Sequence, residues 1–145
     1  MKKTIIEHAK KYVFTLVGYN GSVPLNILTQ DSCSEVSRLL GQWLHAKFPK
    51  AKISIYKGKV KGHFHDLLLV HDDKVYVIDP TVWQFFQHKK SILIATEDSV
   101  DDAVVALMRN YGGKWELSER VNGYSAIEIE RLKNIIKKNI PAYFH

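Results

Sequence analysis

The sequence predicts an α+β fold in which helices pack against a small antiparallel sheet. Apolar residues recur with helical spacing towards both ends of the chain, and they alternate with polar residues, as in strands, across its middle. The length of 145 residues is typical of one domain, and no repeat or Gly/Pro-rich linker divides the chain. We therefore expect residues 1–145 to form a single domain.

Four helices are predicted, each preceded by a hydroxyl residue that has an acidic residue three positions later. Such a capping box satisfies free N–H groups in the first helical turn. The pairs are Thr4/Glu7, Ser32/Glu35, Ser99/Asp102 and Ser125/Glu128. The helices are expected to end where glycine or proline interrupts them, near Gly18, before Pro49, at Gly112-Gly113 and before Pro141.

The sheet is expected between the second and third helices and around the third. Strands are predicted at 52–57, 64–70 and 75–78, with weaker candidates at 91–95 and 114–118. A turn with Asp72 and Asp73 at its centre would join two of these strands. That turn would place Asp66 opposite Asp79, and His65 within about one residue of Asp79 across the strands.

Composition and charge exclude several classes of partner. The net charge is +6, but the basic residues are scattered in pairs, so we expect no nucleic-acid partner. The longest apolar run, 67–70, is too short to span a membrane. Glu7, Lys10 and Lys11 interrupt the apolar core that a secretory signal needs. We expect a protein that is cytoplasmic, or exported without a conventional signal peptide.

Cys33 is the only cysteine, which excludes an intramolecular disulfide and a multi-cysteine zinc site. If Ser32 caps the helix, Cys33 takes the first helical position, where free N–H groups and the helix dipole favour a thiolate. A thiolate is the nucleophilic form of cysteine. The alternative role of a lone cysteine is that of a small buried apolar residue.

Two histidines near the start of the strand 64–70 are candidate bases for Cys33. An imidazole that accepts the thiol proton needs a carboxylate to fix its tautomer and to stabilise the imidazolium. Asp79, at the end of the returning strand, would supply that carboxylate to His65. His63 points to the same face of its strand and is the second candidate.

Segments 31–44 and 65–81 resemble the core of papain-like and transglutaminase-like cysteine enzymes. In these families a cysteine opens a helix, a histidine begins a strand, and a later strand ends in Asp-Pro-Thr. The match of 65–70 to the histidine strand favours His65 over His63. The resemblance implies a papain-like/transglutaminase-like core and a cofactor-free Cys33-His65-Asp79 triad acting on a protein or peptide substrate.

Within this superfamily, the compact chain and the segment 77–86 resemble bacterial protein-glutamine deamidase effectors and toxins. The resemblance thus favours deamidation of glutamine, while a cysteine protease or a transglutaminase on the same triad stays open. Where papain-type proteases carry an oxyanion glutamine, this chain has Ile27. Gln30 is nearer to Cys33 and is the candidate replacement.

Two other classes of function also stay open. His63, His65 and Asp66 form a short run that would suit a metal-binding protein. The same scaffold would also suit a non-catalytic binding protein. The aromatic cluster Trp83, Phe85 and Phe86 is expected in the core rather than along a groove, because exposed aromatic rings are costly.

Overall fold

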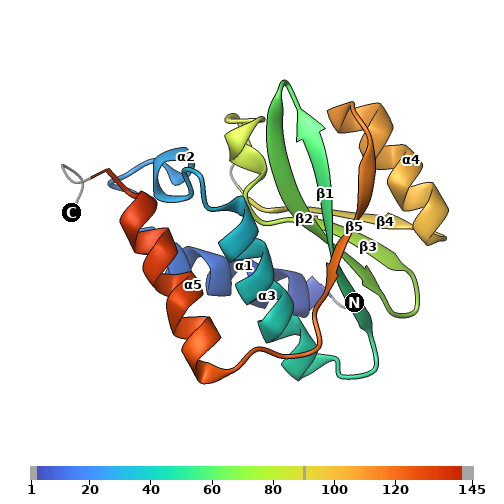
Figure 1. The fold of residues 1–145 in the computed structure, drawn as a ribbon, viewed down its shortest axis with the longest axis horizontal. Helices are drawn as coiled ribbons and strands as arrows, with labels where there is room; N and C mark the ends of the chain where they lie inside the picture. The colour runs from blue at the N-terminus through green and yellow to red at the C-terminus, as the bar shows by residue number, and fades with distance from the viewer. Residues whose placement is uncertain (1–2, 90, 142–145) are drawn as a thin grey trace.

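An antiparallel sheet of five strands forms the middle layer and has helices on both faces (Figure 1). The structure is a computed structural model that describes residues 3–89 and 91–141. Its elements are α1 Lys3–Val17, α2 Leu25–Leu28, α3 Cys33–Lys47, β1 Lys52–Val60, β2 His63–His71, β3 Val75–Asp79, the 3₁₀ turn η1 Val82–Gln84, β4 Leu93–Glu97, α4 Val100–Tyr111, β5 Trp115–Arg120 and α5 Ala126–Asn139. The strand order is β4-β3-β2-β1-β5, which confirms the predicted α+β class.

The sheet separates two hydrophobic clusters. Helices α1, α3 and α5 pack on one face and α4 packs on the other. Successive residues of a strand point to opposite faces, so Leu68 of β2 joins the α3 side and Leu67 joins the α4 side. By the same alternation, Asp66 lies on the α3 face and His65 on the α4 face.

The four predicted helices and the predicted strands are present, but several ends differ. Strand β1 continues beyond the predicted end to Val60, β2 starts earlier at His63, and β4 and β5 lie later than expected. Helix α2 and turn η1 were missed because both are too short to produce a periodic apolar pattern.

Ser99 and Ser125 form the predicted caps, accepting hydrogen bonds from the backbone N–H groups of Asp102 and Glu128. The cap predicted at Thr4 is wrong, because Thr4 lies within α1, and its side chain lies outside the described residues.

The pairing of β2 with β3 is shifted by one residue from the predicted register. The loop 72–74 has one more residue than the expected turn. Continued by one pair, the observed ladder places Asp79 opposite Leu67 rather than Asp66. His65 is two residues from Leu67, so it shares a sheet face with Asp79 as a diagonal neighbour.

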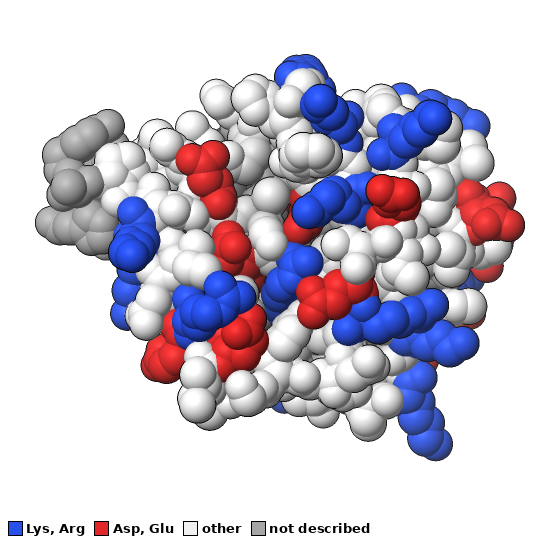
Figure 2. Space-filling view, viewed as in Figure 1, with Lys and Arg blue, Asp and Glu red and all other residues white. Residues whose placement is uncertain are grey.

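Charged side chains of both signs are interspersed on the face drawn in Figure 2, where Lys and Arg do not gather into a single stripe. Within 3–89 and 91–141, no helix has the length and apolar character needed to cross a membrane.

Candidate active site

Cys33 is the first residue of α3 and is partly buried. The loop before it is held by the end of α5, because Nδ2 of Asn139 donates to the Asp31 carbonyl (3.0 Å) and to Ser32 Oγ (3.1 Å). Asp31 has a φ of 56°, a left-handed conformation that is uncommon outside glycine. The loop therefore turns sharply into α3 and is fixed there by a second helix.

The hydroxyl of Ser32 is directed away from α3, so the capping box predicted there is wrong. It donates to the carbonyl of Gln30 (3.2 Å) and accepts from Asn139, and it makes no bond to the helix. These loop contacts compete successfully with the cap. As a result, no Ser32 cap occupies the N–H groups at the start of α3, which begins at Cys33.

His65 and Asp79 form a buried pair in which Nε2 of His65 lies 2.8 Å from Oδ2 of Asp79. The side chains are 1% and 0% exposed. The Thr81 N–H donates to Oδ1 of Asp79 (3.0 Å), and the Tyr111 hydroxyl donates to Oδ2 (2.6 Å). Hydrogen bonds to both oxygens compensate for the burial of the carboxylate.

Two contacts tie the strand of His65 to the helix of Cys33. Ser37 Oγ donates to the Asp66 carbonyl (3.2 Å), and Arg38 Nη1 lies 2.9 Å from Asp66 Oδ2. Both donors belong to α3, and Asp66 is the residue after His65. This clamp fixes the distance between the start of α3 and the imidazole.

The electrostatics favour a charged imidazole. Burial lowers the pKa of His65 and is the largest single influence. The charge and hydrogen bond of Asp79, together with smaller contributions from a hydrogen bond to Cys33 and from its charge, outweigh burial and raise the pKa to about 10. Because Asp79 occupies Nε2, Nδ1 is left for the Cys33 sulfur. Burial, followed by the charge of Asp79, raises the pKa of Tyr111 and keeps its hydroxyl a donor.

Aromatic rings surround the His65 ring. Phe85 meets it edge to face at 4.8 Å between centroids, Tyr111 stacks at 5.9 Å, and Trp115 lies at 6.3 Å. Gly58 pairs with both His65 and Trp115 across neighbouring strands, and a β-carbon there would overlap the Trp115 ring. The missing side chain therefore lets Trp115 reach across β1 to the imidazole.

A pocket of about 250 Å³ lies beside Cys33 and His65. It is lined by Asp31, Cys33, His63, Phe64, His65, Gln84 and Phe85. Pockets for drug-sized ligands hold about 300–1,000 Å³, so this one suits a single amino-acid side chain. Phe64 is 69% exposed, which places an aromatic surface beside the pocket.

The structure brings together Cys33, His65 and Asp79, the three residues predicted as a triad. His63 is exposed and lines the same pocket, but Asp79 contacts His65. The expectation for Gln30 is wrong in position: its side chain is exposed and outside the lining of this pocket, because the chain turns at Asp31 between it and Cys33.

Comparison with known proteins found no match. No family model, no curated protein and no solved structure matches this chain. The chemistry of the site is therefore argued from its own geometry. The Cys33 thiol interacts with the His65 imidazole, and the imidazole interacts with the Asp79 carboxylate.

Sequence reasoning missed four residues of the site. Tyr111 and Trp115 are distant in sequence and gave no periodic or motif signal. Gln84 and Phe85 lie three and four residues after Thr81 of the Asp-Pro-Thr segment, which was the only sequence signal near them. Within the aromatic cluster, Trp83 is buried as expected. Phe85 and Phe86 are partly buried against the core, and each also lines a hollow, Phe85 the pocket beside Cys33 and Phe86 the larger cavity described below.

His63, His65 and Asp66, the residues suggested for a metal site, do not form a common set of ligands. Among the described residues, no group of three or more His, Cys, Asp or Glu side chains is placed to hold a metal ion. His65 and Asp66 point to opposite faces of β2, and Asp66 is paired with Arg38.

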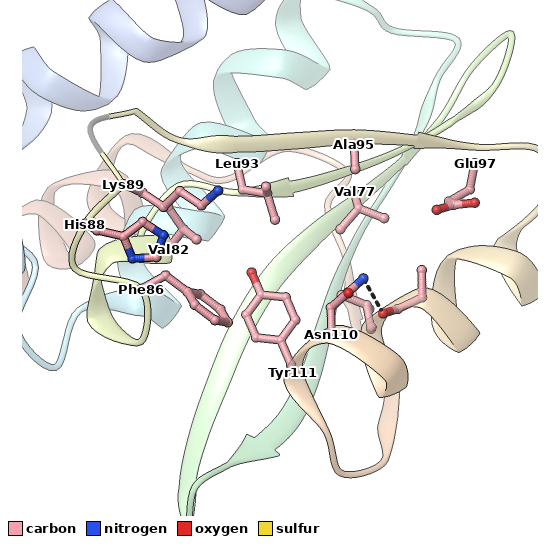
Figure 3. Close-up of a pocket in the computed structure, with 12 residues that line it drawn as sticks. Val77, Val82, Phe86, His88, Lys89, Leu93, Ala95, Glu97, Asn110 and Tyr111 are labelled. Atoms are coloured by element: carbon pink, nitrogen blue, oxygen red, sulfur yellow. Dashed lines mark hydrogen bonds between the residues drawn. The ribbon is translucent and has the colours of Figure 1, made fainter.

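A larger cavity of about 520 Å³ lies between α4 and strands β3 and β4 (Figure 3). Tyr111 and Phe86 lie side by side at one end, with ring centroids 5.5 Å apart, and Glu97 lies at the other end (Figure 3). Leu93 and other apolar side chains form most of the wall. Tyr111 therefore has two contacts of interest, because it lines this cavity and its hydroxyl donates to Asp79.

Proposed function

We propose that this protein is a cysteine-nucleophile acyl-transfer enzyme that deamidates glutamine side chains of protein substrates. The observation that carries the proposal is the connected series of Cys33, His65 and the buried Asp79. A cysteine with a purely structural role has no need of an imidazole that a buried carboxylate orients. The resemblance to papain-like/transglutaminase-like enzymes on the same residues supports this assignment.

In the first half of the reaction, the Cys33 thiolate attacks the carboxamide carbon and forms a C–S bond. The carbonyl oxygen becomes an oxyanion, which N–H groups at the start of α3 stabilise. The C–N bond then breaks as His65 gives its proton to the leaving nitrogen, which departs as ammonia. A thioester on Cys33 remains.

In the second half, His65 removes a proton from water, and the resulting hydroxide attacks the thioester carbon. The C–S bond breaks, the new carboxylic acid loses its proton to water and leaves as a carboxylate, and the thiolate–imidazolium pair is restored. Asp79 keeps the imidazole oriented in both halves and stabilises its charged form.

The size of the pocket favours a side chain as the reacting group. A volume of about 250 Å³ accommodates a glutamine side chain. Cleavage of a backbone amide would require polypeptide on both sides of the reacting carbon to fit beside Cys33. A side-chain carboxamide instead reaches the sulfur at the end of a flexible stem.

Mass spectrometry of casein incubated with the protein tests this function. We expect glutamines to gain the mass that separates an acid from an amide, and Cys33→Ala to abolish the change. Backbone cleavage would identify a protease, and incorporation of added putrescine would identify a transglutaminase. No Cys33-dependent change in casein or in other candidate partner proteins would favour a binding protein.

Activation of Cys33 can be tested without a substrate. Iodoacetamide at pH 6 should label Cys33 far faster than a cysteine in an unstructured peptide, because the imidazolium of His65 stabilises the thiolate. His65→Gln should abolish the advantage. His63→Gln is the matched control and should retain most of it. Labelling at the rate of the peptide would contradict an activated nucleophile.

A further inference from the structure

Gln84 lines the pocket beside Cys33, and its carboxamide is held from one side. Its Nε2 donates to the carbonyl of Asn26 (3.0 Å) and to Oγ1 of Thr29 (2.6 Å). A primary amide has two N–H bonds, and these two contacts use both. Gln84 therefore has no N–H left to stabilise an oxyanion.

The surrounding hydrogen bonds fix which end of the amide faces the pocket. The Asn26 carbonyl can only accept. The Thr29 hydroxyl donates to the Leu25 carbonyl (2.7 Å), so its oxygen must accept from Gln84 and from Trp83 Nε1 (2.6 Å). A flipped Gln84 would place its oxygen against these acceptors. Within the described residues, Oε1 of Gln84 has no hydrogen-bond partner.

We propose that Gln84 is a specificity-determining residue whose Oε1 accepts a hydrogen bond from the N–H group of the substrate amide; this rests on the function proposed above. The N–H groups at the start of α3 would bind the carbonyl oxygen, and Gln84 would bind the nitrogen. Both ends of the carboxamide are then recognised by complementary groups.

This contact explains how the site would separate substrate from product. The substrate amide offers N–H donors, whereas the product carboxylate and an ester offer only acceptors. Oxygen facing oxygen is repulsive, so the product is released and esters bind poorly. For a partly exposed hydrogen bond, we expect a preference of roughly tenfold.

Alkylation of Cys33 in the full chain tests this contact. Iodoacetamide carries N–H donors, whereas N,N-dimethyliodoacetamide carries none. The quantity compared is the rate of alkylation by iodoacetamide divided by the rate with the dimethyl reagent. We expect this ratio to be roughly tenfold higher for Cys33 in the protein than for a free thiol. Gln84→Met, similar in size and without a carboxamide, should lose this preference while retaining its rate with the dimethyl reagent. Gln87→Met, an exposed glutamine outside the Cys33 pocket, is the control and should retain the preference.

The possible failures are distinguishable. If neither reagent labels Cys33 faster than a free thiol, the proposed function and this inference both fail. If labelling is fast but the preference is the same in Gln84→Met, the inference alone is overturned. If Gln84→Met slows both reagents equally, Gln84 only supports the loop through Thr29, which also overturns the inference.

Discussion

The hydroxyl of Tyr111 donates to the oxygen of Asp79 that also holds His65, at 2.6 Å from that atom. The other oxygen accepts from the Thr81 N–H. The carboxylate is thus fixed at both ends and cannot rotate away from the imidazole. Helix α4, which carries no residue of the proposed triad, contributes to the orientation of His65 through this one side chain.

Tyr111→Phe removes the hydroxyl and keeps the ring that stacks on His65. We expect the rate of Cys33 alkylation to fall roughly tenfold, which corresponds to the loss of one hydrogen bond to a charged group. If Tyr111 acts through Asp79, Tyr111→Phe/Asp79→Asn should be no slower than Asp79→Asn alone. Independent, additive losses in the double variant would contradict this role.

Asp79→Asn keeps the shape of the side chain and removes the charge that raises the pKa of His65. The imidazole should then be largely neutral at neutral pH, and the thiolate should lose its counter-ion. We expect Cys33-dependent activity to fall at least about a hundredfold. Asp72→Asn, in the exposed loop after β2, is the control, and an equal loss in that variant would refute the assignment.

The stability of the protein should depend on pH through His65. Its pKa rises from 6.5 to about 10 on folding, so its stabilising contribution is complete below about pH 6.5. That contribution should fall by at most about 1.4 kcal/mol per pH unit as the pH rises towards 10. This contribution is the difference in free energy of unfolding between the protein with His65 and the His65→Gln variant. It is measured by urea unfolding, with Cys33→Ser present in both proteins. A difference that stays constant from pH 6 to 10 would argue against a raised pKa.

Gly58→Ala should destabilise the protein by about 1–3 kcal/mol, because a β-carbon overlaps the Trp115 ring. Displacement of that ring would also loosen the surroundings of His65 and slow Cys33 alkylation. Trp115→Leu in the same chain should relieve the overlap, so the double variant should lose less stability than the two single variants added together. Additive losses would show that the two residues do not interact.

Local patterns in the sequence were sufficient for the four longer helices, and they singled out Cys33, His65 and Asp79 as candidates. Cys33 opens a helix as predicted, although the hydroxyl of Ser32 bonds to the loop instead of the helix. The predicted register of β2 and β3 was wrong by one residue, because the alternation of residues in the strands does not determine the length of the loop between them. With the predicted register, His65 and Asp79 would have faced opposite sides of the sheet.

Contacts between distant segments could not be predicted in this way. Gln84 takes its place in the pocket through bonds to Asn26 and Thr29, which lie far away in sequence. Tyr111 reaches Asp79 from the end of a helix. Tyr111 has no sequence neighbour that indicates its role, and for Gln84 the nearby Asp-Pro-Thr segment indicates only the region, because the tertiary fold brings both side chains to the site.

The bonds from Asn139 to Asp31 and Ser32 span 108 and 107 residues. Asn139 can make these bonds only after the residues up to α5 have been synthesised, and closing so long a loop costs conformational entropy. During synthesis, the turn before Cys33 would stay unanchored until α5 has left the ribosome and docked. A chain without α5 should therefore be latent, and Cys33 should become reactive only once α5 has docked.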